Sequence, residues 1–165
     1  MSFFMPSAVS LSMSFKRVCA ALLCAASLSS FADAPFTVST DGTEVTDAKT
    51  GLIWRRCAEG MVASLSGCTG TASTFTHEAA LARARSQSGW RLPNVQELSS
   101  IADLSRQSPA IDGVAFPATP SSAFWSSSPV VGYAQGAWVV YFVNGYVDDD
   151  FRDGAGYVRL VRAGQ

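Results

Sequence analysis

Residues 138–147 read Trp-Val-Val-Tyr-Phe-Val-Asn-Gly-Tyr-Val, and they contain the clearest structural signal in the chain. Two runs of β-branched and aromatic residues, which favour strands, flank the dipeptide Asn144-Gly145. Asn-Gly favours a two-residue type I′ turn, whose twist matches that of two paired strands. The stretch therefore predicts a β-hairpin and, with it, an antiparallel sheet.

Further strands are expected on both sides of this hairpin. Short runs of similar composition lie at 52–54, 124–128 and 157–162. In the last run, successive side chains alternate between the two faces of a strand, so Arg159 faces away from Leu160. The hairpin is therefore expected to belong to a larger sheet.

Two helices are expected upstream of the hairpin. The first begins at Thr74 or Thr76, whose hydroxyl can cap exposed amides, and its alanine-rich run ends at Gly89. The second begins at Asn94, and Glu97 completes a capping-box-like pattern three residues later.

Residues 106–136 lack a regular period and contain four prolines, which is typical of a long irregular loop with a function. The order of strand, two helices, loop and further strands predicts an α+β domain with an antiparallel sheet. A chain of 165 residues has room for one such domain. Its formal net charge of −1 argues against a nucleic-acid partner.

The first 32 residues have the features of a secretory signal peptide. The basic pair Lys16-Arg17 precedes an apolar run at 18–28, and small residues favour cleavage after Ala32. The apolar run is about half the ~20 residues needed to span a bilayer, so no stable membrane span is expected after cleavage. The sequence predicts an exported protein, periplasmic or at the cell surface, with a linker at 33–44 and a domain at 45–165.

Cleavage would remove two of the four cysteines and leave Cys57 and Cys68. It would also leave 10 basic and 13 acidic residues, a formal charge of −3. In an oxidising compartment, two nearby cysteines in a Gly/Ser/Thr-rich segment are expected to form a disulfide. A metal or redox pair is the alternative, but it lacks CxxC spacing and nearby ligands.

Catalytic groups are scarce. The single histidine, His77, lies beside the expected start of the first helix, where we predict an exposed and inert imidazole. No Gly-rich phosphate loop, nucleophile elbow or HExxH motif occurs. An enzyme would need carboxylates such as Glu78, Glu97 and the run 148–150 in one cleft. We therefore predict a non-enzymatic protein.

The run Asp148-Asp149-Asp150 is the only concentrated charge in the sequence. Carboxylate oxygens are hard ligands that suit Ca²⁺, so these residues are candidates for a calcium site, although their spacing is not that of an EF-hand. A solvated turn or a protected strand edge is the alternative. No other cofactor is expected.

Aromatic residues around the irregular segment are candidates for ligand binding, because their faces can pack on pyranose rings. Trp125, Tyr133 and Trp138 could form such a surface, and the alternative for the tryptophans is burial in the core. Asn144 and Tyr146 join the candidates because ligand contacts are also expected in the turn of the hairpin.

A structural role is expected for Arg91, which follows Trp90 in the short linker between the two helices. Its guanidinium can bind loop carbonyls or a carboxylate such as Glu97. Either contact would tie the linker into the core.

Six short motifs occur in an order that resembles one known family. They are Thr50-Gly51-Leu52-Ile53-Trp54, the Cys57–Cys68 loop with Thr69-Gly70, Trp90-Arg91-Leu92-Pro93-Asn94 with Glu97-Leu98, Phe124-Trp125-Ser126-Ser127-Ser128, Ala137-Trp138 and Tyr157-Val158-Arg159-Leu160-Val161-Arg162. From about residue 45 to 162, the chain resembles the Lcl C-terminal domain family, named for a bacterial collagen-like adhesin. The motif residues expected to be structural are Trp54, Trp90, Arg91, Pro93, Glu97, Trp138 and Arg159.

The resemblance implies a C-type-lectin-like fold, akin to that of formylglycine-generating enzymes, in which the long loop carries binding. It also implies an adhesin-like module whose partner is a glycan or an envelope or surface protein. A sulfated polysaccharide would fit if Arg83, Arg85, Arg91 and Arg106 cluster. The alternative function is a structural or assembly subunit of a cell-surface or envelope complex.

Overall fold

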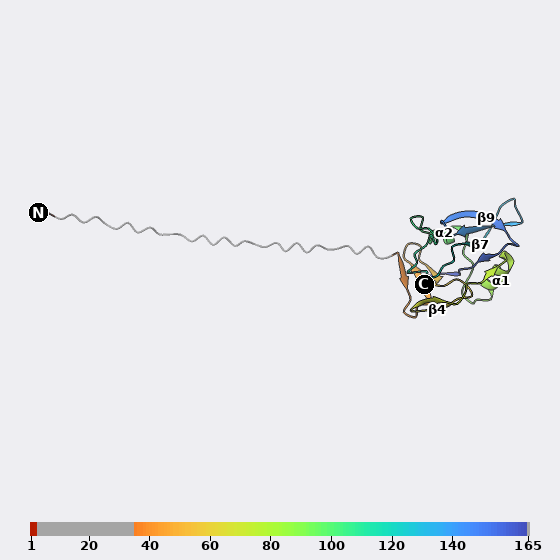
Figure 1. The fold of residues 1–165 in the computed structure, drawn as a ribbon, viewed down its shortest axis with the longest axis horizontal. Coiled ribbons are helices and arrows are strands. Elements are labelled where there is room, and N and C mark those ends of the chain that lie inside the picture. Colours follow the sequence, from red (N-terminus) through yellow and green to blue (C-terminus); the bar gives the residue numbers. More distant parts are fainter. Residues whose placement is uncertain (3–34, 165) are drawn as a thin grey trace. The chain divides into compact units, whose positions relative to one another are not determined.

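The computed structural model describes residues 1–2 and 35–164. Within 35–164 the chain forms an α+β domain with mainly antiparallel sheets and two helices, which confirms the predicted fold class (Figure 1). The predicted signal peptide lies outside the described residues apart from its first two, and the C-type-lectin-like topology stays a prediction. No helix in the described part of the chain is long and apolar enough to cross a membrane.

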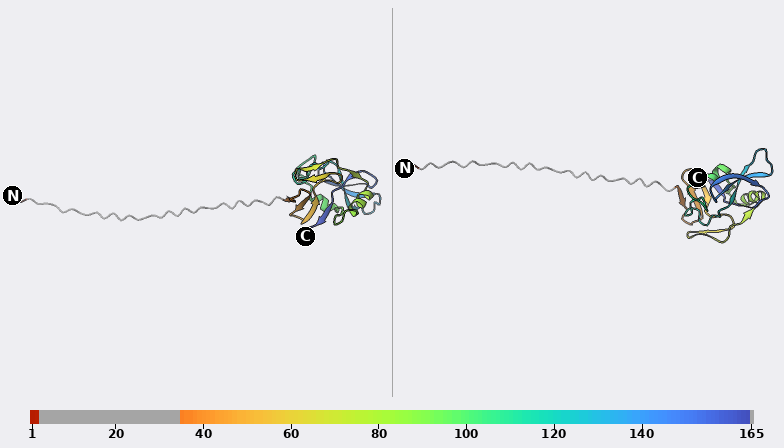
Figure 2. Two further views of the ribbon diagram at one scale, coloured as in Figure 1. Left: turned by 90° about the horizontal axis from the view of Figure 1, so that it is seen from below. Right: turned by 45° about the horizontal axis from the view of Figure 1, so that its top comes forward.

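The first sheet joins strands from both ends of the described chain. Its order is β1 (Phe36–Val38), β2 (Glu44–Asp47), β3 (Leu52–Arg55) and β11 (Val161–Ala163), and all its pairs are antiparallel. Figure 2 shows the orange early strands beside the dark blue last strand. Residues near position 55 and near position 162 are therefore neighbours on one sheet.

The second sheet contains the predicted hairpin. Its order is β6 (Thr74–Phe75), β10 (Gly156–Tyr157), β7 (Ala123–Pro129), β8 (Gly136–Tyr141) and β9 (Tyr146–Phe151). Only the β10–β7 contact in this sheet is parallel, and β9 is an edge strand. A separate hairpin consists of β4 (Val62–Ser64) and β5 (Gly67–Thr69).

The hairpin of β8 and β9 is confirmed, but the predicted two-residue turn is wrong. The strands pair as far as Tyr141 and Tyr146, so residues 142–145 form a four-residue loop. Phe142 leaves the strand and is fully buried, which lengthens the connection. Gly145, with φ of +81°, makes the left-handed bend, and its N–H donates to the Tyr141 carbonyl at 2.7 Å.

Both predicted helix starts are confirmed. α1 (His77–Arg85) is capped by Thr76, whose hydroxyl accepts from the Ala79 N–H at 3.3 Å. α2 (Val95–Ser100) begins with a capping box in which Asn94 and Glu97 each accept the other's backbone N–H at 2.8 Å. Reciprocal capping of this kind satisfies two amides that a helix leaves unpaired.

Two apolar clusters pack on opposite faces of β7. Phe124 belongs to the cluster around Trp54, Phe116 and Phe142, whereas Trp125 belongs to the cluster around Leu160 and Ala80. Adjacent strand residues point to opposite faces, so Phe124 packs into one cluster and Trp125 into the other.

Residues between α2 and β7 run irregularly, as predicted, yet they also supply core side chains. Ile111, Ala115 and Phe116 are all buried. The segment 106–122 is therefore held in place by packing, and β7 confirms the strand predicted at 124–128 within the same stretch.

Candidate functional site

The predicted disulfide between Cys57 and Cys68 is confirmed, with sulfurs 1.98 Å apart. It links the segment after β3 to strand β5. Disulfides of this kind persist in oxidising compartments, so the bond is consistent with export.

Trp125 does not offer a stacking face, so its assignment as a ligand-binding residue is wrong. The side chain is 1% exposed, and its Nε1 donates to the Phe75 carbonyl at 2.7 Å. The indole is large and apolar and lies in the middle of a sheet, which is why burial prevails.

The other candidate ligand residues lie at opposite ends of the β8–β9 hairpin. Tyr133 contacts Phe151, which pairs with Gly136 at one end, whereas Asn144 and Tyr146 lie in and beside the loop at the other. A strand of six residues separates these ends by about 17 Å. The structure therefore does not bring Tyr133, Asn144 and Tyr146 into one site.

The three aspartates form most of the edge strand β9. Successive residues of a strand face opposite sides, so Asp149 points away from Asp148 and Asp150. Asp148 accepts the Asp149 N–H at 2.9 Å, and Asp150 accepts the Phe151 N–H at 2.8 Å. This arrangement matches the alternative of a protected strand edge. Among the described residues, no group of three His, Cys, Asp or Glu side chains is placed to hold a metal ion.

His77 is buried, so the prediction of an exposed imidazole is wrong. Its side chain is 2% exposed, its Nε2 lies 3.0 Å from the Ser126 carbonyl, and its ring packs against Trp125. Burial is the main cause that lowers its pKa, since it disfavours the charged form. An N-cap residue is usually exposed, but His77 follows the cap and faces the sheet.

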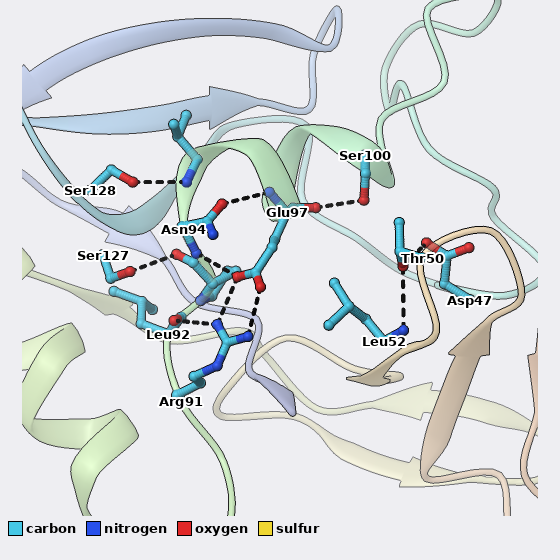
Figure 3. A network of polar contacts seen from close by, with 12 residues as sticks. Asp47, Thr50, Leu52, Arg91, Leu92, Asn94, Glu97, Ser100, Ser127 and Ser128 are labelled. Atoms are coloured by element: carbon cyan, nitrogen blue, oxygen red, sulfur yellow. Dashed lines mark hydrogen bonds and ion pairs between the residues drawn. The ribbon is translucent and has the colours of Figure 1, made fainter. Parts of the chain in front are cut away.

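The linker between the helices is fixed by one arginine–carboxylate fork (Figure 3). Arg91 Nη1 and Nη2 donate to the two carboxylate oxygens of Glu97 at 2.7 and 2.6 Å, and Nη1 also lies 3.5 Å from the Leu92 carbonyl. The bond to Arg91 is the main cause that lowers the pKa of Glu97, and it raises the pKa of Arg91. Behind the fork, the Pro93 carbonyl accepts the Ser127 N–H at 2.7 Å.

Arg159 is the central polar residue of the core. It is fully buried and donates to the backbone carbonyls of Arg55 and Arg56, and to the Thr119 hydroxyl at 2.8 Å. Its guanidinium also lies 4.8 Å from the Phe116 ring centroid. Burial lowers the pKa of Arg159 to about 9. These contacts hold the end of β3 against the irregular segment.

The remaining motif tryptophans have different surroundings. Trp54 is buried at the centre of the first sheet, whereas Trp138 and Trp90 are half-buried. Two guanidinium groups lie over the ring of Trp90, that of Arg55 at 4.2 Å and that of Arg162 at 5.3 Å, measured from guanidinium carbon to ring centroid.

Arg55, one of the two arginines over Trp90, is a residue that sequence analysis missed. It is half-buried, and among the described residues its side chain makes no hydrogen bond or ion pair. By contrast, Arg162 is bound to Glu44 at 2.7 Å. The alternation of β3 places Arg55 on the face opposite Trp54, but only the pairing of β3 with β11 brings it beside Arg162.

Arg55 lines one hollow, and Trp90 lines another. The first has a volume of about 430 Å³, and its polar lining consists of Thr43, Arg55, Glu59, Arg83 and Gln87. The second has a volume of about 260 Å³ and is lined by Leu81, Ala84, Arg85, Trp90, Arg91, Leu92 and Ser127. We call the surface formed by Arg55, Trp90 and the first hollow the arginine face.

The arginines that a polyanion would need cluster only in part. Arg83 lines the first hollow, and Arg85 and Arg91 line the second. Arg106 lines neither and is bound to Asp103 at 2.8 Å. Arg83 is itself bound to the nearly buried Glu59 at 2.6 Å. The cluster therefore carries less uncompensated charge than the residue count suggests.

The carboxylates that an enzyme would need are not assembled. Glu78 is exposed on α1 beside Arg85, Glu97 is bound to Arg91, and the aspartates lie on β9. None of them lines either hollow.

Fold and surface together define a disulfide-linked α+β domain with a polar, arginine-lined hollow. The chain belongs to the Lcl C-terminal domain family, which matches residues 43–162. That family is surface-associated and is not a known enzyme family. A search of curated proteins found no match.

Proposed function

We propose that this protein is an exported, non-enzymatic, adhesin-like module that binds a glycan at the arginine face. The observation that carries the proposal is Arg55, which is stacked on Trp90, has no carboxylate partner among the residues that the structure describes, and lines a hollow of about 430 Å³. A guanidinium presents five N–H donors in a fixed plane, and stacking on an aromatic ring orients it before a ligand arrives.

The rest of the hollow suits a hydroxyl-rich ligand. Thr43 and Gln87 can donate and accept hydrogen bonds, and Glu59 can accept them, while Met61 and Ala63 offer small apolar surfaces. Alternating polar and apolar surface matches a sugar ring, which carries hydroxyls at its edge and C–H groups on its faces. Support from the family is general, since its members are surface-associated.

A glycan array with neutral and anionic sugars, probed with the purified protein, tests the proposal. We expect a saturable hit that the Arg55→Gln variant weakens about tenfold or more, because charge-assisted hydrogen bonds are lost. The matched control is Arg106→Gln, which removes the same charge outside both hollows. Binding that both variants weaken equally, or no binding to any glycan, contradicts the assignment.

A further inference from the structure

The edge of the second sheet carries a surface of different chemistry. Phe151 is 59% exposed, and it shares one face of β9 with Val147 and Asp149. On this face Asp149 lies directly across from Trp138 of β8, and Phe151 lies across from Gly136. We call Tyr133, Trp138, Asp149 and Phe151 the aromatic–acidic patch.

Gly136 brings these side chains together. A Cβ atom at this position would lie 2.4 Å from Cδ1 of Tyr133 and 3.3 Å from Oδ2 of Asp149. The Tyr133 ring and the Asp149 carboxylate therefore both lie against the bare Cα of Gly136. The Tyr133 ring also meets Phe151 edge to face, with centroids 6.1 Å apart.

A carboxylate among aromatic rings is suited to a cation. Ring faces attract ammonium and guanidinium groups, and the carboxylate adds a charge-assisted hydrogen bond. Among the described residues Asp149 has no ion-pair partner. The neighbouring cation, Arg152, donates instead through Nε to the Gly136 carbonyl at 2.9 Å.

Charge along the same strand favours a polypeptide over a single small cation. Asp148 and Asp150 face the other side of β9, and together with Asp153 they also make no ion pair among the described residues, so this edge strand is negatively charged on both faces. A basic segment with several Lys or Arg side chains complements such a strand.

Backbone pairing is not the mode of docking that this edge favours. The Asp148 and Asp150 carboxylates already accept the N–H groups of Asp149 and Phe151. An added strand would have to displace both contacts, whereas side-chain docking on the patch leaves them in place.

We propose that the aromatic–acidic patch binds an arginine or lysine side chain of another polypeptide and makes this sheet edge a docking surface for a basic protein segment. The patch shares no residue with the arginine face, so the proposal stands independently of glycan binding. It gives the domain a second partner, recognised by charge and aromatic contact.

The test uses the full protein and two synthetic Gly/Ser peptides, one with three arginines and one with three citrullines at the same positions. Citrulline keeps the shape of arginine without its charge. We expect the arginine peptide to bind, with quenching of tryptophan fluorescence, and the citrulline peptide not to bind. Asp149→Asn, which is nearly isosteric, and Phe151→Ala should each weaken binding about five- to tenfold. The control Glu78→Gln removes one exposed carboxylate on α1 and should bind as the wild type does.

Three outcomes overturn the proposal. Equal binding of both peptides, or none of either, removes the cation from recognition. A loss with Asp149→Asn but not with Phe151→Ala indicates diffuse attraction without an aromatic contact. A concentration-dependent dimer that Asp149→Asn dissociates in sedimentation would assign the patch to a second copy of this chain.

Discussion

The arginine face and the aromatic–acidic patch compensate charge in opposite ways. Around the arginine face, Arg83 and Arg162 each bind a glutamate, whereas Arg55 has no carboxylate partner among the described residues. On the patch, Asp149 has no ion pair among the described residues. A charged side chain is available to a ligand only where no ion pair within the chain already neutralises it. The number of charged residues on a surface is therefore a poor guide to its binding.

The two surfaces also differ in how the chain supports them. The arginine face depends on contacts between distant segments, because the first hollow is lined by Cys57 of the disulfide and by Arg83 of α1. The patch depends on local hairpin register, in which Trp138 pairs with Asp149. Changes to the long-range supports should therefore affect the first surface and spare the second.

Removing the disulfide should give the largest effect. Replacing Cys57 and Cys68 with Ser is expected to lower the free energy of unfolding by about 3 kcal/mol, because the unfolded chain loses a closed loop. Calorimetry measures the lower Tm. Below that temperature, glycan binding should weaken, since Cys57 lines the hollow, while binding of the arginine peptide should not.

A reductant supplies the control for this change. It should lower the Tm of the wild type and leave that of the double serine variant unchanged. Equal losses at both surfaces would show that the disulfide supports the whole domain and that the two surfaces are not separately supported.

Sequence patterns predicted the features that depend on local chemistry. The hairpin, both helix caps and the pairing of Cys57 with Cys68 follow from propensity, capping residues and the cysteine count. The arginine face was missed because Arg55 and Trp90 are 35 positions apart and meet only through tertiary packing.

Burial was the other source of error. His77 was expected to be exposed, and Trp125 was a candidate ligand residue with core burial as the alternative. Both are at most 2% exposed, and their rings pack against each other. Sequence alternation shows which residues share a face, but it does not show which face a helix will cover.

Removing the two aspartates that protect the edge strand β9 should have an intermediate effect, seen mainly as aggregation. Replacing Asp148 and Asp150 with Ala removes the acceptors of two outward N–H groups on β9. We expect light scattering to rise several-fold at high protein concentration, because a free strand edge pairs with other chains. The change in unfolding free energy should stay within about 1 kcal/mol.

Asp153→Ala is the control. This substitution removes a charge of the same kind, but Asp153 lies beyond the end of β9. If it raised scattering as much as the double variant, lost charge would be the cause, and the protection by Asp148 and Asp150 would be contradicted.

The smallest expected effect concerns the fork beside the arginine face. The pKa of Glu97 is lowered from its usual 4.5, chiefly by Arg91, so the folded state favours the charged carboxylate. Its contribution to stability is therefore present above pH 4.5 and is lost as pH falls below that value.

Glu97→Gln should lower the free energy of unfolding by about 0.5–1 kcal/mol at pH 7, since the fork is partly exposed to solvent. At pH 3 the difference from the wild type should shrink, because the carboxylate of the unfolded chain is then largely protonated and folding must release that proton to form the ion pair. Denaturant unfolding at both pH values measures it, with Glu78→Gln as a control that removes an exposed carboxylate away from the fork. A difference that is the same at both pH values would mean that Glu97 acts through its hydrogen bond to the Asn94 N–H, and that the ion pair with Arg91 adds nothing.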